Sequence, residues 1–261
     1  MLAIIKSCSI FGLDSFLVDV EVDVSRGLPS FDIVGLPDAA VRESRERVRA
    51  SIKNCGYDFP IKRITLNLAP ADVRKEGPYF DLPIALGILS ATDQIPSDSL
   101  GAYAIIGELS LDGMLRPVNG VLPMAIEAHK HKLKGVVIPF DNAKEAAVVE
   151  DLEIVAVKSL TEAIDFFKGK LKINIDTIRN SEEVASTDEG DFSEVKGQEA
   201  LKRCLEIAAA GHHNTIIVGP PGSGKTMVAR RLPSILPPMT FDESLELTKL
   251  YSIAGLLPTK S

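Results

Sequence analysis

The segment 219–226 (GPPGSGKT) constrains the fold of this chain more than any other. It fits the phosphate-binding loop pattern G-x-x-x-x-G-K-[ST] at every fixed position. The apolar run 215–218 before it predicts a short buried strand, and residues 227–232 after it predict a helix. A strand, a glycine-rich loop and a helix form the context that this motif requires. The cofactor-binding residues that we expect here are Gly219, Pro220, Pro221, Gly222, Ser223, Gly224, Lys225, Thr226 and Met227.

The expected ligands of this loop are ATP and Mg²⁺. Glycines let the backbone turn its N–H groups toward phosphate oxygens, and a helix start adds partial positive charge. Lys225 is expected to reach the β- and γ-phosphates, and Thr226 is expected to ligate the magnesium ion. An ordinary turn rich in glycine and proline is the alternative, but it does not explain the adjacent lysine and threonine.

Composition limits the class of protein. The chain has 261 residues, which predicts one or two domains, and its apolar fraction of 45% is that of an ordinary globular protein. No apolar run is long enough to cross a membrane, and three widely spaced cysteines favour reduced thiols, so we expect a cytoplasmic protein without a membrane partner. The net charge of −7 argues against coating of nucleic acid by bulk charge, so any DNA contact must be local or made by assembly.

The polar, acidic stretch 179–191 suggests a boundary between domains. We expect an α+β domain over residues 1–172, an acidic linker over 173–192, and the N-terminal part of an α/β P-loop domain over 193–261. Hairpins come first and strand–helix units later in the first domain, a mixture typical of α+β folds. The expected strands lie at 18–24, 31–34, 64–68, 135–138 and 153–156. A hairpin is expected to turn on Asp112 and Gly113. The expected helices lie at 38–54, 81–91, 121–131, 143–150, 159 onward, 198–210 and 240–254.

The P-loop domain is expected to be truncated. Several more strands, and the acidic residue that helps to hold magnesium, should follow a loop of this kind. We therefore expect a piece of a longer ATPase that contains no catalytic residue of its own and hydrolyses ATP poorly or not at all alone.

Four stretches of the first domain resemble the proteolytic domain of Lon-type ATP-dependent proteases: 76–78 (EGP), 106–113 (IGELSLDG), 117–120 (PVNG) and 136–142 (VVIPFDN). The resemblance implies a Lon-protease-like (S5-like) fold. That family uses a serine nucleophile and a lysine base, and the matching positions here hold Tyr79 and Leu122. Neither side chain can supply the missing chemistry, so we expect no peptidase activity.

Nearly the whole chain resembles the magnesium-chelatase-like AAA+ ATPases of the ComM/YifB type. The stretches that carry this resemblance are 31–38 (FDIVGLPD), 64–72 (ITLNLAPAD), 80–85 (FDLPIA), 197–198, 219–233 and 252–256. The resemblance implies a homo-hexameric, DNA-dependent ATPase with branch-migration helicase activity in recombination during natural transformation. A magnesium-chelatase subunit, an ATP-dependent protease and a non-enzymatic assembly scaffold remain as alternatives.

Two basic pairs that flank one strand and its following loop are candidate DNA contacts, because few carboxylates interrupt them: Lys62, Arg63, Arg74 and Lys75. Arg42, Arg45 and Arg49 share one side of the helix 38–54. They could contact phosphates, but pairing of Arg42 with Glu46, and of Glu43 with Arg47, on a solvated face is the favoured interpretation.

Three further positions have two interpretations each. By the resemblance to AAA+ proteins, Val195 and Gln198 would lie near the adenine, although they could simply begin the next helix. Tyr79 could stack on a base, or it could fill the rim of the vacated serine site. No metal site is predicted at His212 and His213, because no ligand partner has suitable spacing.

Overall fold

The computed structural model describes residues 1–171 and 190–257, so most of the predicted acidic linker lies outside the described residues. The chain divides into two compact units. The first contains described residues 1–171 and 246–257, and the second contains residues 190–245.

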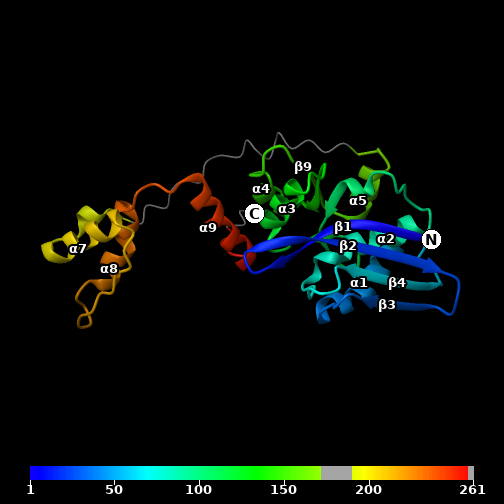
Figure 1. The fold of residues 1–261 in the computed structure, drawn as a ribbon, viewed down its shortest axis with the longest axis horizontal. Helices are drawn as coiled ribbons and strands as arrows, with labels where there is room; N and C mark the ends of the chain where they lie inside the picture. The colour runs from blue at the N-terminus through cyan, green and yellow to red at the C-terminus, as the bar shows by residue number, and fades with distance from the viewer. Residues whose placement is uncertain (172–189, 258–261) are drawn as a thin grey trace. The chain divides into compact units, whose positions relative to one another are not determined.

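A seven-stranded mixed sheet forms the first unit (Figure 1). Its antiparallel part comprises β1 with β2 and β2 with β4, and its parallel part comprises β3 with β4, β1 with β5, β5 with β8, and β8 with β9. The β1–β2 hairpin comes first as predicted, but β3 and β4, which a helix connects, already pair in parallel before the β6–β7 hairpin, so the predicted order holds only in part. Across the sheet the strands are β3 (Ser30–Val34), β4 (Arg63–Ala69), β2 (Asp14–Ser25), β1 (Leu2–Phe11), β5 (Tyr103–Ile105), β8 (Gly135–Pro139) and β9 (Glu153–Val157).

The two long strands, β1 and β2, differ in whether their sequence patterns predict a strand. β2 was predicted correctly, because Val18, Val20 and Val22 alternate with acidic residues and are fully buried. β1 was not predicted. Three consecutive residues, Ser7 to Ser9, are buried in it, since both of its faces are covered, and this removes the polar–apolar alternation.

Helices cover both faces of the sheet. In α2 (Asp81–Ala91), Gly87 lies against Ile5, whereas the thiol of Cys8 donates to a carbonyl of α3 (Val121–Lys130). Ile5 and Cys8 lie an odd number of residues apart in one strand, so their side chains point to opposite faces. The other elements of this unit are α1 (Ala39–Asn54), η1 (Pro78–Phe80), η2 (Leu100–Ala102), β6 (Glu108–Leu109), β7 (Leu115–Arg116), η3 (Phe140–Asn142), α4 (Ala143–Ala146) and α5 (Leu160–Phe167).

Local signals placed most of these elements correctly. The side chain of Asp38 caps α1 by accepting from the Val41 N–H at 2.8 Å, and Ser159 accepts from the Glu162 N–H at 3.2 Å. Gly113 has φ of 86° at the predicted turn between β6 and β7. α4 is shorter than the predicted helix 143–150, since it ends at Ala146.

The second unit is a small set of helices. A core of Phe192, Val195, Leu205 and Val228 joins them. The strand predicted at 215–218 does not form, because no strand among the described residues of this unit offers it hydrogen-bond partners. The elements are η4 (Phe192–Glu194), α7 (Glu199–Ala210), α8 (Lys225–Arg231), η5 (Leu232–Ile235) and the beginning of α9 (Phe241–Ala254). The residues of α9 from Glu246 onward belong to the first unit.

Candidate functional site

The predicted phosphate loop folds around the ammonium of Lys225. Its Nζ donates to the carbonyl oxygens of Gly219 and Pro220, both at 2.7 Å, and lies 3.3 Å from Ser223 Oγ. Gly222 and Gly224 have φ of 79° and 82°, in the left-handed region that suits glycine. Glycine thus occupies both positions of the loop where the backbone is left-handed, and the lysine side chain lies within the loop.

The residues around the loop differ in what they contribute. Gln198 donates from Nε2 to the carbonyl oxygen of Ser223 at 2.9 Å, so it lies against the loop. Val195 is buried in the core of the unit instead. Thr226 and Met227 are exposed at the start of α8. The structure thus brings Gln198 to the loop, whereas the Val195 side chain packs among apolar neighbours.

The donor types at this loop fit a magnesium–nucleotide. Mg²⁺ prefers oxygen ligands and is commonly held by one or two protein side chains together with phosphate oxygens. The Thr226 hydroxyl is an oxygen donor of this type, and the Lys225 ammonium is a cation of the type that suits phosphate. Over residues 1–171 and 190–257, no group of three or more His, Cys, Asp and Glu side chains is placed to hold a metal ion.

The positions that match the protease dyad are both in the interior. Leu122 is fully buried, and Tyr79 is 7% exposed. The Tyr79 hydroxyl lies 3.2 Å from Ser9 Oγ, and burial raises the pKa of this phenol. Tyr79 is therefore a core residue, neither on a rim nor open to stack on a base, which corrects both interpretations of its position.

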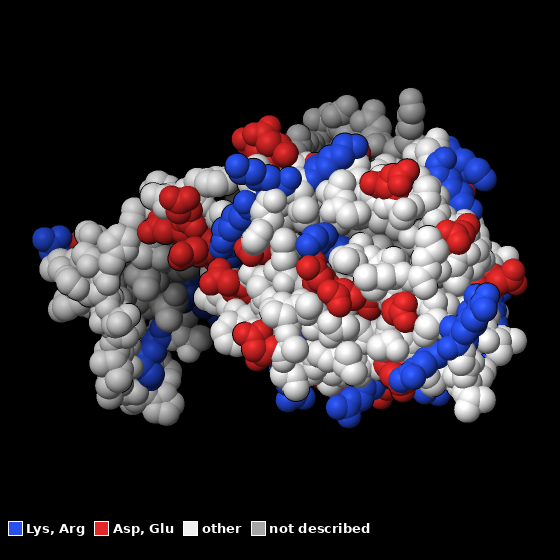
Figure 2. Space-filling view, turned by 45° about the vertical axis from the view of Figure 1, so that its right-hand side comes forward, with Lys and Arg blue, Asp and Glu red and all other residues white. Residues whose placement is uncertain are grey.

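The candidate DNA contacts separate into exposed and buried residues. Lys62 and Arg63 are exposed, and Arg74 is exposed beside Glu76, with 3.3 Å between their charged atoms. Lys75 is fully buried, and its Nζ donates to the Val73 carbonyl oxygen at 2.7 Å, so it does not present its charge to a ligand. Backbone bonds to residues 36 and 38 hold this lysine inward. Figure 2 shows acidic and basic side chains interspersed over the visible face.

The ion pairs of α1 differ in part from the predicted ones. Arg47 approaches Glu43 at 4.0 Å as predicted, but Arg45, and not Arg42, pairs with Glu46 at 3.2 Å. Arg47 also pairs with the buried Asp81, a contact that no local sequence pattern predicts, since it joins two helices. No helix in the described part of the chain has the length and apolarity of a membrane span.

Two family models match the chain, and both describe the same protein subunit. "Subunit ChlI of Mg-chelatase" matches residues 20–142, and "Magnesium chelatase, subunit ChlI" matches residues 191–261. The first match covers most of the mixed sheet, and the second covers the phosphate loop. The chain therefore belongs to the magnesium chelatase ChlI family, whose members are AAA+ ATPases.

Within this family the chain is similar to two named proteins. It is 42% identical to competence protein ComM of Haemophilus influenzae over 97% of this chain, and 40% identical to YifB of Escherichia coli over the same share. Each alignment covers 50% of the relative, so the chain spans about half the length of these curated relatives. Lon protease 2 of Bacillus subtilis is 28% identical over 62% of the chain and 32% of its own length.

Proposed function

We propose that this chain carries the ATP-binding part of a DNA-dependent AAA+ ATPase that acts as a branch-migration motor in recombination. The observation that supports this most directly is the loop around Lys225, whose ammonium is held by the Gly219 and Pro220 carbonyl oxygens. Phosphate oxygens are stronger acceptors for a lysine than these carbonyls, so a bound nucleotide would take over the ammonium. The similarity to a competence protein supports DNA as the partner.

The residues of the loop would divide the work of holding Mg·ATP. Lys225 would neutralise phosphate charge, the loop N–H groups would orient the phosphates, and the Thr226 hydroxyl would bind magnesium, which supplies charge neutralisation at the transferred phosphate. Gln198, hydrogen-bonded to the loop, would fix its position beside the base. A homo-hexamer would place neighbouring subunits beside this nucleotide, as in AAA+ assemblies.

The first unit, apart from its residues 246–257, would be a Lon-like domain without peptidase activity. The similarity to Lon proteases supports this fold, and the burial of Tyr79 and Leu122 supports the loss of cleavage. We assign residues 1–172 to this domain and 193–261 to the start of the ATPase domain. The Lon-like domain would serve assembly or DNA contact through exposed basic residues such as Lys62 and Arg63.

Two measurements test this function. The first is binding of a fluorescent ATP analogue to this chain with Mg²⁺, which we expect to be lost in Lys225→Ala and kept in Arg203→Ala, a control at an exposed position of α7. The second is ATP turnover by the whole protein with and without single-stranded and branched DNA. A several-fold rise with DNA that disappears in Lys225→Ala supports the motor. Turnover that ignores DNA contradicts it.

A magnesium-chelatase subunit is the second candidate, because both family models describe that subunit. The two functions make different predictions for the whole protein. A chelatase would show ATP turnover that responds to a porphyrin acceptor, whereas the proposed motor would respond to DNA.

A further inference from the structure

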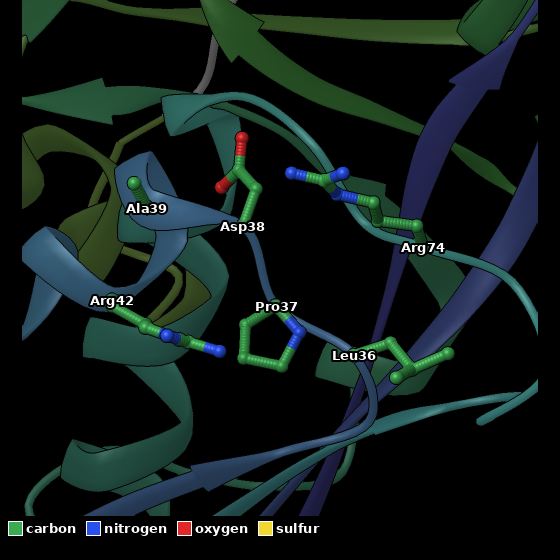
Figure 3. Close-up of a pocket in the computed structure, with 6 residues that line it drawn as sticks. All are labelled: Leu36, Pro37, Asp38, Ala39, Arg42 and Arg74. Carbon is green, nitrogen blue, oxygen red and sulfur yellow. The ribbon is translucent and has the colours of Figure 1, made fainter.

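A hollow of about 440 Å³ opens on the first unit beside the start of α1 (Figure 3). It lies where the turn after β3 meets the loop after β4. Apolar side chains and two guanidinium groups share its wall. The lining residues are Leu36, Pro37, Asp38, Ala39, Arg42 and Arg74.

Backbone bonds hold the two walls of this hollow together. The Asp38 N–H donates to the Lys75 carbonyl oxygen at 3.0 Å, and the Lys75 N–H donates to the Leu36 carbonyl oxygen at 3.1 Å. Leu36 has φ of 56°, a value that residues other than glycine seldom adopt. The buried Lys75 side chain fastens the same loop from within. The hollow is therefore formed before any ligand arrives.

The charges on the hollow favour an anion. The guanidinium of Arg42 makes no ion pair or hydrogen bond with the residues that the structure describes, and that of Arg74 has only an exposed pair with Glu76. Exposed pairs of this kind are weak, so Arg74 can exchange its partner. Asp38 is the carboxylate among the lining residues, and its two oxygens already accept from the N–H groups of Val41 and Gly77.

We propose that this hollow binds a phosphate anion between Arg42 and Arg74. Guanidinium groups suit phosphate because their parallel N–H donors match two of its oxygens. The apolar side of the hollow, formed by Leu36, Pro37 and Ala39, would lie against the carbon skeleton attached to the phosphate. The source that fits is a phosphodiester group of a DNA strand, and this choice of source rests on the proposed function.

The test uses the full chain with either Arg42→Gln or Arg74→Gln, both at exposed positions. Arg116→Gln is the control, because Arg116 is also exposed but pairs with Glu108 and does not line the hollow. Binding of a labelled single-stranded oligonucleotide is measured across salt concentrations. Each hollow variant should weaken binding and reduce the log–log salt slope by about 0.7, the share of one phosphate contact on a single strand. The control should leave the slope unchanged. An unchanged slope in both hollow variants overturns the DNA assignment.

A second measurement shows which source of phosphate the hollow binds. It also tests the phosphate site independently of the proposed function. The Nε–H signals of Arg42 and Arg74 are followed by NMR as inorganic phosphate or the oligonucleotide is added. Shifts with both probes support the proposal. Shifts with phosphate alone overturn DNA as the source and keep the phosphate site. No shift with either probe overturns the site, even where the wild-type chain binds DNA elsewhere and turnover by the whole protein still responds to DNA.

Discussion

Arg47 in α1 donates from Nε to Oδ2 of Asp81 at 2.6 Å and ties that helix to the first residue of α2. Asp81 is fully buried, while the arginine side chain is 21% exposed. Arg47 also donates from a terminal nitrogen to Asp81 Oδ1 at 3.1 Å, so the pair is bidentate. The Leu109 N–H donates to the same carboxylate at 3.2 Å, which connects the β6–β7 hairpin to both helices.

Removal of Arg47 should destabilise the first unit. In Arg47→Met the Asp81 carboxylate would stay buried without its cation, and breaking a buried pair in this way costs about 3 to 5 kcal/mol. Urea denaturation would measure the loss in the free energy of unfolding. Arg116→Met is the matched control: this arginine is exposed and should change stability by less than about 0.5 kcal/mol. Equal losses in the two variants would refute the role of the buried pair.

Asp81 should also give the protein a distinctive response to pH. Burial outweighs the bonds from Arg47 and raises the pKa of Asp81 from its ordinary value of 3.8 to about 6. The folded state thus holds this proton more tightly than the unfolded state, so the stability it contributes is complete below pH 4 and is lost as pH rises through 6. The two-unit difference corresponds to about 3 kcal/mol.

The measurement is urea denaturation at several pH values between 4 and 7, for the wild type and Asp81→Asn. The difference between their free energies of unfolding should change over this range, because only the wild type carries the titrating carboxyl. A difference that is constant with pH would show that Asp81 does not titrate there.

Gly87 should tolerate no side chain. A Cβ at this position would lie 2.6 Å from Val22 Cγ2 and 3.4 Å from an Ile5 carbon, at the contact of α2 with the sheet. Because valine is stiff and buried there, Gly87→Ala should cost about 1 to 3 kcal/mol of unfolding free energy, despite the better helix propensity of alanine. At Gly101 a Cβ would meet no atom within 4 Å, so Gly101→Ala serves as the control. A Gly87→Ala protein as stable as the control would contradict this packing.

The Tyr79 hydroxyl should contribute to stability and to no cleavage reaction. Tyr79→Phe removes the bond between this hydroxyl and Ser9 Oγ, which should cost about 1 kcal/mol. Thermal unfolding measures this loss, and Tyr57→Phe at a partly exposed site is the control. A casein-cleavage assay should read zero for the wild type and for both variants. Cleavage that disappears in Tyr79→Phe would overturn the core role of this residue.

The sequence predicted those strands, turns and helix starts that depend on neighbouring residues alone. Alternating valines marked β2, an aspartate–glycine pair marked the β6–β7 turn, and Asp38 marked the start of α1. The role of the phosphate loop stays a prediction: Gly222 and Gly224 have left-handed backbones, and Lys225 donates to loop carbonyl oxygens.

These local rules do not predict contacts between residues that lie far apart in the sequence. Lys75 is buried because the backbone on either side of it pairs with residues 36 and 38, a contact that no local pattern reveals. Arg42 and Arg74 lie on one hollow for the same reason, although 31 residues separate them in sequence. Strand 215–218 was predicted from its apolar residues, but a strand also requires neighbours to accept its hydrogen bonds.

That segment has a consequence for how the chain behaves in solution. Ile217 packs on the core of the second unit, whereas Ile216 and Val218 are 90% and 87% exposed. Over the described residues, the backbone of 215–218 makes no hydrogen bond. An apolar stretch of this kind, with open donors and acceptors, is a template for pairing with another chain. The concentration at which this chain begins to aggregate should therefore depend on these four residues, and a lysine at Ile216 should raise it.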